Sequence, residues 1–126
     1  NLFNTVRSWQ GSGNYPGTDD WYIIEIPAGT KVYGGLPGPS PFFSVEKTLV
    51  DAGSNKTLYW QSLQVRPDPV FGLRPKVGEY VTTVPTKVAV SRTLANPQYG
   101  TGGAWQFYIE DFPNKVSLSR EITFTP

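Results

Sequence analysis

The stretch Leu94-Ala-Asn-Pro-Gln-Tyr-Gly-Thr-Gly-Gly-Ala-Trp-Gln-Phe-Tyr-Ile109 joins a glycine-rich turn to an apolar strand. Gly100, Gly102 and Gly103 permit positive φ angles and a close approach of the backbone. The last four residues predict a strand whose first side chain, Gln106, is a polar amide. Because that amide stands where the turn meets the strand, we expect it at the rim of a binding site. An ordinary hairpin with a surface glutamine is the alternative.

Short apolar segments bounded by Gly, Pro, Asn or Asp recur on both sides of this stretch. Such segments favour strands, because few windows free of breakers reach the length of about ten residues that a helix needs. We therefore predict an α+β fold that is mostly β, with about seven short strands and at most two short helices. The segments that predict strands are 21–26, 31–33, 58–65, 79–84, 87–91, 106–109 and 116–124.

The remaining segments predict loops or are ambiguous. Residues 1–20 form a polar N-terminal segment, in which 14–20 are typical of a turn or an N-cap rather than a strand. Residues 34–41 alternate Pro and Gly too densely for regular structure and predict a loop. Residues 42–49 are compatible with a strand or with one or two helical turns, for which Ser44 would be the N-cap.

The composition indicates one ordered domain over residues 1–126, since 38% of the residues are hydrophobic. Eleven basic and ten acidic residues are dispersed along the chain and leave a net charge of +1. We therefore expect no nucleic-acid partner, because no Lys/Arg cluster provides an electrostatic footprint. No apolar run approaches membrane-spanning length and no signal-peptide pattern is present, so we also expect no stable membrane association.

The chain contains neither Cys nor His. This excludes thiol and Ser-His nucleophiles, imidazole acid–base chemistry and His/Cys zinc sites, and we expect no metal and no required cofactor. The acidic residues Glu25, Glu46, Glu79 and Glu110 do not form a convincing general acid–base pair by their spacing. Any catalysis must use amides, Arg, Lys, Tyr, Ser or single carboxylates, or hold a substrate that is already activated.

Three regions place polar or aromatic residues next to flexible backbone: Tyr33–Gly35, Phe42–Ser44 and the turn that leads to Gln106. We predict that these regions converge into one cleft. Aromatic faces there would sandwich a flat ring, backbone N–H groups would hold a phosphate or carboxylate, and Gln106 would orient a ribose hydroxyl. The simpler alternatives are core packing for Phe42 and Phe43 and a helix cap for Ser44. The candidate binding residues are Tyr33, Gly34, Gly35, Phe42, Phe43, Ser44, Tyr99 and Gly103.

Two arginines, Arg66 and Arg74, are each followed by a proline, which restricts the local backbone. A guanidinium offers a planar fork of donors that matches a pyrophosphate, so either side chain is a candidate for phosphate binding. The alternative is a surface arginine whose aliphatic stem lies on apolar neighbours.

Two segments, Ile26-Pro-Ala-Gly-Thr-Lys-Val-Tyr-Gly-Gly-Leu-Pro-Gly38 and Leu94–Gln106, resemble the tuberculosis necrotizing toxin family. Members of that family are NAD glycohydrolases with an ADP-ribosyltransferase-like fold. They occur at the C-terminal ends of secreted bacterial polymorphic toxins and in some secreted fungal proteins. The likeness runs from about residue 22 to residue 109, and it implies a split β-sheet core with NAD or NADP as the substrate.

The same resemblance assigns roles to individual residues. Gln106 matches a glutamine that the family uses at its active site. The family usually carries an Arg just before its Leu-Pro, where this chain has Gly35, so we assign the charged catalytic role to Arg74 and take Arg66 as the second choice. The resemblance further implies a cognate immunity protein, and secretion or delivery from the producing cell to act in the target-cell cytoplasm.

Three other functions stay open. Transfer of ADP-ribose to a protein is the first, although Ala104 stands where such transferases often carry a Glu. A histidine-free nuclease toxin using Lys, Tyr and Thr is the second. The third is a non-catalytic β-rich module that binds carbohydrate or mediates adhesion, in which exposed Trp and Tyr rings would stack on sugars.

Overall fold

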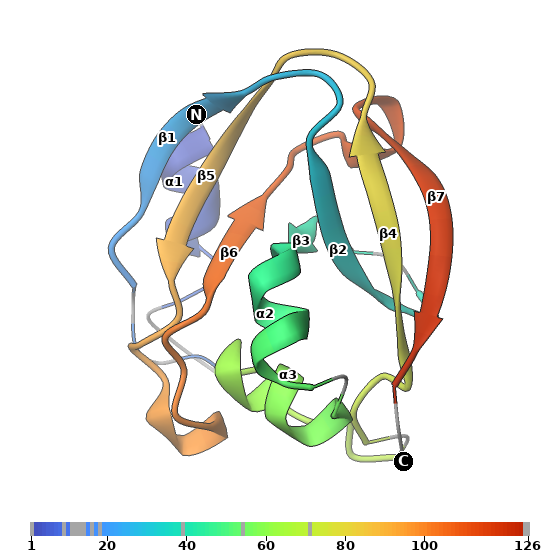
Figure 1. Ribbon diagram of the computed structural model, residues 1–126. Coiled ribbons are helices and arrows are strands. Elements are labelled where there is room, and N and C mark those ends of the chain that lie inside the picture. Colours follow the sequence, from blue (N-terminus) through green and yellow to red (C-terminus); the bar gives the residue numbers. More distant parts are fainter. Residues whose placement is uncertain are drawn as a thin grey trace.

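The computed structural model describes residues 2–8, 10, 15, 17, 19–38, 40–53, 55–70 and 72–124. These residues contain seven strands and three α-helices (Figure 1), which confirms an α+β fold that is mostly β and exceeds the expected two helices by one. The elements are α1 (Leu2–Ser8), β1 (Tyr22–Ile26), β2 (Lys31–Leu36), β3 (Phe42–Phe43), α2 (Glu46–Asp51), α3 (Lys56–Ser62), β4 (Lys76–Thr82), β5 (Thr86–Arg92), β6 (Trp105–Tyr108) and β7 (Val116–Thr123).

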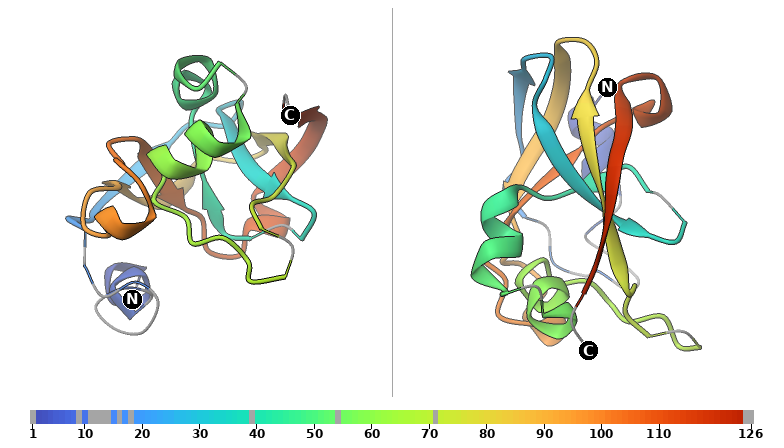
Figure 2. Two further views of the ribbon diagram at one scale, coloured as in Figure 1. Left: turned by 90° about the horizontal axis from the view of Figure 1, so that it is seen from below. Right: turned by 45° about the vertical axis from the view of Figure 1, so that its right-hand side comes forward.

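The strands pair into two antiparallel sheets. One has the order β1-β5-β6-β3 and the other the order β2-β4-β7. A single bridge between Tyr33 and Ser44 connects β2 to the residue that follows β3, with two backbone hydrogen bonds of 2.9 and 2.7 Å. Figure 2 shows the two sheets facing each other, with α2 and α3 at one end of the molecule.

The space between the sheets holds one of the hydrophobic clusters. Side chains alternate between the two faces of a strand, so every second residue of β1, β5 and β6 points inward. The described cluster consists of the buried residues Ile26, Val32, Phe43, Tyr80, Val88, Ile109 and Val116.

The prediction of a strand at 58–65 is wrong, because this segment contains α3. Asn55 caps the helix by accepting a hydrogen bond from the Leu58 N–H at 3.0 Å. Tyr59, Trp60 and Leu63 are buried together, at the i, i+1 and i+4 spacing of one helical face. An apolar run this short is compatible with the two-residue period of a strand and with the 3.6-residue period of a helix. The Asn55 cap and the packing of α3 on β2 and β4 stabilise the helix.

The prediction of a loop at 34–41 is wrong for its first three residues, which continue β2 to Leu36. Gly34 and Gly35 pair with Gly78 and Val77 of β4. A Cβ at Gly35 would lie 2.5 Å from Cη2 of Trp60, so the glycine lets α3 pack directly on the strand.

The ambiguous segment at 42–49 contains both predicted structures in succession. Phe42 and Phe43 form β3, and α2 begins at Glu46 with Val45 as its N-cap residue. The expectation that Ser44 caps this helix is therefore wrong, because its backbone instead pairs with Tyr33.

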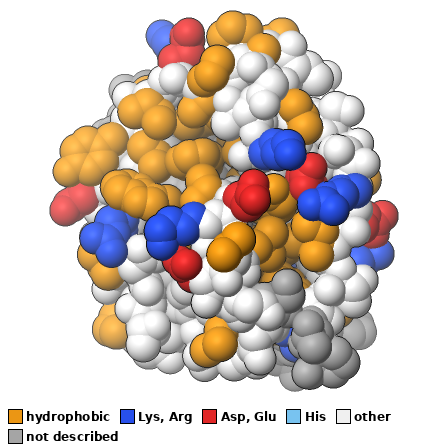
Figure 3. Space-filling view, viewed as in Figure 1, with side chains coloured by type: hydrophobic (Ala, Val, Ile, Leu, Met, Phe, Trp, Pro, Cys, Tyr) orange, Lys and Arg blue, Asp and Glu red, His pale blue; other side chains and the backbone are white. Residues whose placement is uncertain are grey.

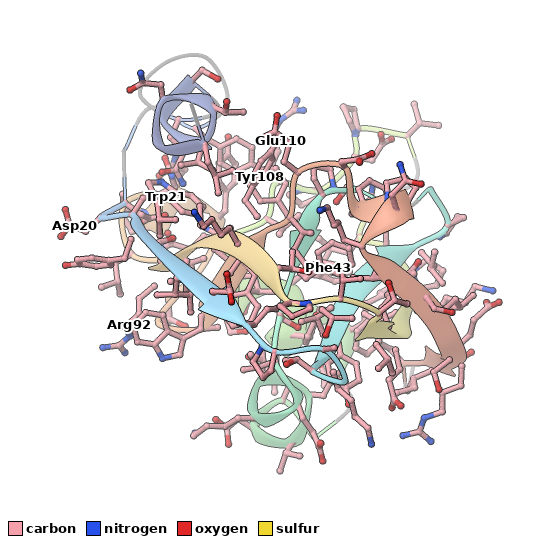
Figure 4. All side chains as sticks on the ribbon, turned by 90° about the horizontal axis from the view of Figure 1, so that it is seen from above. Asp20, Trp21, Phe43, Arg92, Tyr108 and Glu110 are labelled. Carbon is pink, nitrogen blue, oxygen red and sulfur yellow. The ribbon has the colours of Figure 1, made fainter. Side chains whose placement is uncertain are left out.

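The polar N-terminal segment, for which no helix was specified, begins with α1. Val6 packs with Trp21, Ala89 and Tyr108 on the outer face of the four-stranded sheet. Figure 4 shows Trp21 and Tyr108 on the side of α1, whereas Phe43 lies on the side of the second sheet. The turn expected at 14–20 lies partly outside the described residues.

Several large apolar side chains are exposed on the four-stranded sheet. Tyr22, Ile24 and Trp105 are 61%, 42% and 44% exposed, and Figure 3 shows hydrophobic side chains gathered over this part of the molecule. Arg92 lies over the Trp105 ring at 6.0 Å. None of the helices in the described residues is long and apolar enough to cross a membrane.

A buried carboxylate on β4 is paired with an exposed arginine. Glu79 is 4% exposed, and its Oε2 accepts hydrogen bonds from Nε of Arg120 at 2.8 Å and from the Tyr33 hydroxyl at 3.3 Å. Lys31 Nζ lies 4.0 Å from the other carboxylate oxygen. The hydrogen bond from Arg120 lowers the pKa of Glu79 below its usual range.

We expect Glu79 to make stability depend on pH. Its folded pKa is below the unfolded value of about 4.3, so its contribution is complete above that value and is lost as the pH falls through the folded pKa. Thermal unfolding measured against pH should show a shallower acidic decline for Glu79→Gln than for the wild type. Glu121→Gln, which changes a half-exposed carboxylate, is the control. Parallel curves for wild type and Glu79→Gln would contradict this expectation.

Candidate functional site

A cavity of about 320 Å³ lies between α3, the strands β2, β3 and β6, and residues that precede β1. Its walls combine aromatic and apolar side chains with eight polar or charged ones, and such a mixture is typical of a small-molecule site. The lining residues are Gln10, Tyr15, Asp19, Tyr33, Gly35, Ser40, Pro41, Phe42, Phe43, Ser44, Tyr59, Trp60, Leu63, Gln64, Val65, Arg74, Asn96 and Gln106.

Gln106 reaches this cavity because successive side chains of β6 point to opposite faces of the sheet. Trp105 and Phe107 point to one face of the sheet, and Gln106 points to the other. Its Nε2 donates to Oγ of Ser91 at 3.1 Å and to Oδ2 of Asp19 at 3.4 Å. Oε1 of Gln106 accepts no hydrogen bond from the described residues, and the side chain lines the cavity, so we take Oε1 as the end of the amide that is available to a ligand there.

Asp19 is a buried carboxylate in the cavity wall, 7% exposed. Its Oδ1 accepts hydrogen bonds from the backbone N–H groups of Leu94 and Ala95 at 2.8 and 2.7 Å. Oδ2 accepts from Nε2 of Gln10 at 2.8 Å, and the Asp19 N–H donates to Oε1 of Gln10 at 2.7 Å. These contacts join the N-terminal residues to the segment that precedes the glycine-rich turn.

Two further amides hold the same part of the wall. Asn96 Oδ1 accepts from the Gly17 N–H at 2.9 Å, and its own N–H donates to Oε1 of Gln64 at 2.9 Å. Gln64 has a left-handed backbone with φ 52°, and its Nε2 donates to the Gly100 carbonyl at 3.2 Å. The amide side chains therefore fix the position of the glycine-rich turn that leads into β6.

On the opposite wall, the hydroxyls of Ser44 and Tyr59 form a short hydrogen bond. Both residues are almost completely buried. Burial raises the pKa of Tyr59, so its phenol stays neutral at physiological pH. This pair is thus a neutral donor and acceptor and supplies no negative charge to the cavity.

The two predicted phenylalanines face different sides of the sheet. Phe42 packs edge-on against Tyr108, with ring centroids 5.2 Å apart, on the α1 side. The Phe43 ring contacts Tyr80 and Phe112 in the core between the sheets. Both residues line the cavity. The Phe43 ring is nevertheless mainly a core side chain, which agrees with the alternative of core packing.

The two predicted arginines occupy different positions. Arg74 lines the cavity, and its guanidinium donates to the carbonyls of Pro37 and Gly38 at 3.0 and 3.1 Å. Arg66 instead lines a neighbouring cavity of about 620 Å³, which shares Arg74 and Trp60 with the first.

Besides Arg66, three predicted binding residues do not line the main cavity. Gly34 lies under the Phe43 ring, Tyr99 packs edge-on against Tyr15, and Gly103 donates its N–H to the Thr93 carbonyl at 2.8 Å. The structure thus brings together Tyr33, Gly35, Phe42, Phe43, Ser44, Arg74 and Gln106 from the predicted set.

Sequence reasoning missed most of the polar lining, including Gln10, Asp19, Gln64 and Asn96. No local pattern marks these residues, because each acts through partners far away in the chain.

Comparisons with known proteins agree with this architecture. The chain matches the family described as "Rhs1 C-terminal toxin domain" over residues 1–111. It is 33% identical to Rhs1-CT, solved in complex with its cognate immunity protein RhsI1, with a TM-score of 0.94 over 98% of this chain and 96% of that chain. No curated protein sequence matches the chain significantly.

Two more distant structures share the fold. Tne2, solved in complex with Tni2, is 17% identical, with a TM-score of 0.61 over 83% of this chain and 92% of that chain. Tse6, solved in complex with Tsi6, is 16% identical, with a TM-score of 0.54 over 81% and 74% of the two chains. The family match and the similarity to Rhs1-CT both cover most of the chain. The chain therefore belongs to the family of Rhs1 C-terminal toxin domains, which are C-terminal domains of polymorphic toxins.

Proposed function

We propose that this toxin domain is an NAD(P) glycohydrolase with an ADP-ribosyltransferase-like core, which hydrolyses the bond between nicotinamide and ribose. The observation that carries the proposal is the shared cavity, in which the Gln106 amide and the Phe42 side chain lie in one set of walls. Such a cavity can hold a flat ring and position a ribose hydroxyl at the same time.

The reaction fits a chain without histidine. When the bond between ribose C1′ and the pyridinium nitrogen breaks, both electrons go to the nitrogen and nicotinamide leaves as a neutral molecule. Water then adds to C1′ and releases one proton, which yields ADP-ribose. Because the leaving group needs no protonation, the protein mainly has to hold the substrate and stabilise an oxocarbenium-like ribose.

Individual residues receive roles from their positions. The open Oε1 of Gln106 accepts a hydrogen bond from a ribose hydroxyl and helps to orient water. The Phe42 side chain lies against a ring of the substrate, and Tyr33, which is 2% exposed, forms part of the wall. Arg74 faces the diphosphate from the boundary of the two cavities, with Arg66 in the second cavity.

A cognate immunity protein is part of the proposal. Rhs1-CT was solved in complex with RhsI1, and the present chain shares nearly its whole length with that toxin. We infer that the producing cell makes a matching immunity protein and that the domain acts inside the target cell.

The competing functions give different products. A protein ADP-ribosyltransferase releases nicotinamide only as it modifies a target, and a nuclease leaves NAD intact. A carbohydrate module would have to stack sugars on Trp105 and Tyr22, which are 44% and 61% exposed, because Trp21 and Trp60 are each only 5% exposed.

We expect purified domain incubated with NAD to release nicotinamide and free ADP-ribose in equal amounts, measured by liquid chromatography. The same reaction repeated with NADP measures the preference between the two dinucleotides. Total tRNA in a parallel tube provides the control for nuclease activity. Intact NAD together with cleaved tRNA would refute the glycohydrolase proposal.

A further inference from the structure

The terminal amide of a glutamine has two ends with opposite hydrogen-bonding character, and its orientation must be selected by its neighbours. Around Gln106 these neighbours are Ser91 and Asp19. The Ser91 hydroxyl can donate or accept, so it fits either orientation of the amide. An ionised carboxylate only accepts, and Asp19 therefore distinguishes between the two orientations.

We infer that Asp19 is a positioning residue that directs Nε2 of Gln106 into the wall and leaves Oε1 facing the cavity. The two side chains come from positions 87 residues apart, and their atoms lie 3.4 Å from each other. This inference rests on the proposed glycohydrolase function, because an outward Oε1 can accept from a ribose hydroxyl and turns the partially negative end of the amide toward the oxocarbenium-like ribose.

Asp19 is held rigidly enough for this task. Apart from the contact with Gln106, its carboxylate accepts three hydrogen bonds, from the backbone N–H groups of Leu94 and Ala95 and from the amide of Gln10. Gln10 is fixed in turn, because its Oε1 accepts from the Asp19 N–H and from Nε1 of Trp21 at 3.2 Å. A carboxylate with this many donors has no lone pair left for proton transfer, so its role is orientation.

The substitution Asp19→Asn tests the inference with almost no change of shape. Oδ1 can still accept from Leu94 and Ala95, but an NH₂ group now faces the donors of Gln10 and Gln106. Gln106 can turn its amide over so that Oε1 accepts from the new NH₂ group, and Ser91 can follow by donating its hydroxyl. The donor end of Gln106 then faces the cavity, so we expect kcat for NAD to fall about 10- to 100-fold with little change in KM.

A second substitution should restore the arrangement. Gln106→Glu alone brings two carboxylates together and should be inactive. Combined with Asp19→Asn, the carboxylate introduced by Gln106→Glu accepts from the amide at position 19 and still presents an oxygen to the cavity. We expect the double variant to exceed both single variants in kcat by at least about tenfold, a rescue that general loss of stability cannot produce.

A measurement without substrate separates this inference from the proposed function. In ¹⁵N-labelled domain, the side-chain amide resonances of Gln106 are identified by their loss in Gln106→Ala. They should exchange slowly with water in the wild type and shift on Asp19→Asn, but not on Asp20→Asn, whose side chain is exposed and points outward in Figure 4.

The outcomes are distinct. A wild-type domain that leaves NAD intact refutes the glycohydrolase, while the amide resonances still decide whether Asp19 orients Gln106. Unchanged Gln106 resonances in Asp19→Asn, or a double variant no more active than the singles, would overturn the inference.

Discussion

Replacing Gln106 with alanine is expected to lower kcat for NAD hydrolysis by about 100-fold or more, while the domain stays folded. Loss of one preorganised group that acts on the transition state typically costs a factor of about 10² to 10³. The fold should survive because Asp19 keeps its hydrogen bonds to Leu94, Ala95 and Gln10 after Gln106 is removed. The lost hydrogen bonds themselves should reduce stability by only about 1 kcal/mol.

Initial rates of nicotinamide release and thermal unfolding curves measure the two effects separately. Gln98→Ala is the matched control, because it makes the same substitution at an exposed position of the same segment. Full activity in Gln106→Ala would remove the role assigned to this amide. The same loss of activity in Gln98→Ala would show that the segment as a whole, and not the amide, is responsible.

The second large effect is expected at Gly102, where alanine should destabilise the domain by about 3 kcal/mol or more. Gly102 has a φ of +68°, and a Cβ built on it would lie 1.8 Å from the Thr93 carbonyl oxygen. The same Cβ would approach Nε2 of Gln64 to 2.6 Å. The turn can accept a side chain only by moving away from Thr93 and Gln64, which would also displace Gln106.

Gly53→Ala separates backbone strain from this collision. Gly53 also has a positive φ, +58°, but a Cβ added there would meet no heavy atom within 4 Å. We expect it to cost about 1 kcal/mol, the usual cost of a left-handed non-glycine residue. Urea denaturation of both variants measures the difference. Equal losses in the two variants would mean that crowding at Gly102 contributes nothing.

Turn-forming residues and the alternation of apolar with polar residues were sufficient to predict where most of the strands lie. Strands were predicted at 79–84 and 87–91, and the structure has β4 and β5 at Lys76–Thr82 and Thr86–Arg92. The one strand prediction that was wrong, at 58–65, concerned a short apolar run in which Tyr59 and Trp60 are adjacent. Only the contact of both rings with Phe124 and the opposite strands makes the helical face the buried one.

The candidate site was predicted in part. Gln106 and Phe42 could be singled out because a polar amide or an aromatic pair stands next to breakers, which local sequence displays. Asp19 could not, because its importance comes from its burial and from hydrogen bonds to residues 75 to 87 positions away. Gln10 could not either, because it matters only through its contacts with Asp19 and Trp21.

By itself the sequence determined the fold class, the approximate positions of most strands, and the absence of thiol and imidazole chemistry. These properties depend on each residue and its near neighbours, whose steric and chemical preferences act whatever the rest of the chain does. The tertiary structure alone decided which amide partners surround Gln106, which phenylalanine ring enters the core, and which arginine reaches the main cavity. Those outcomes depend on pairing between distant strands, where a shift of one residue would turn every side chain to the opposite face.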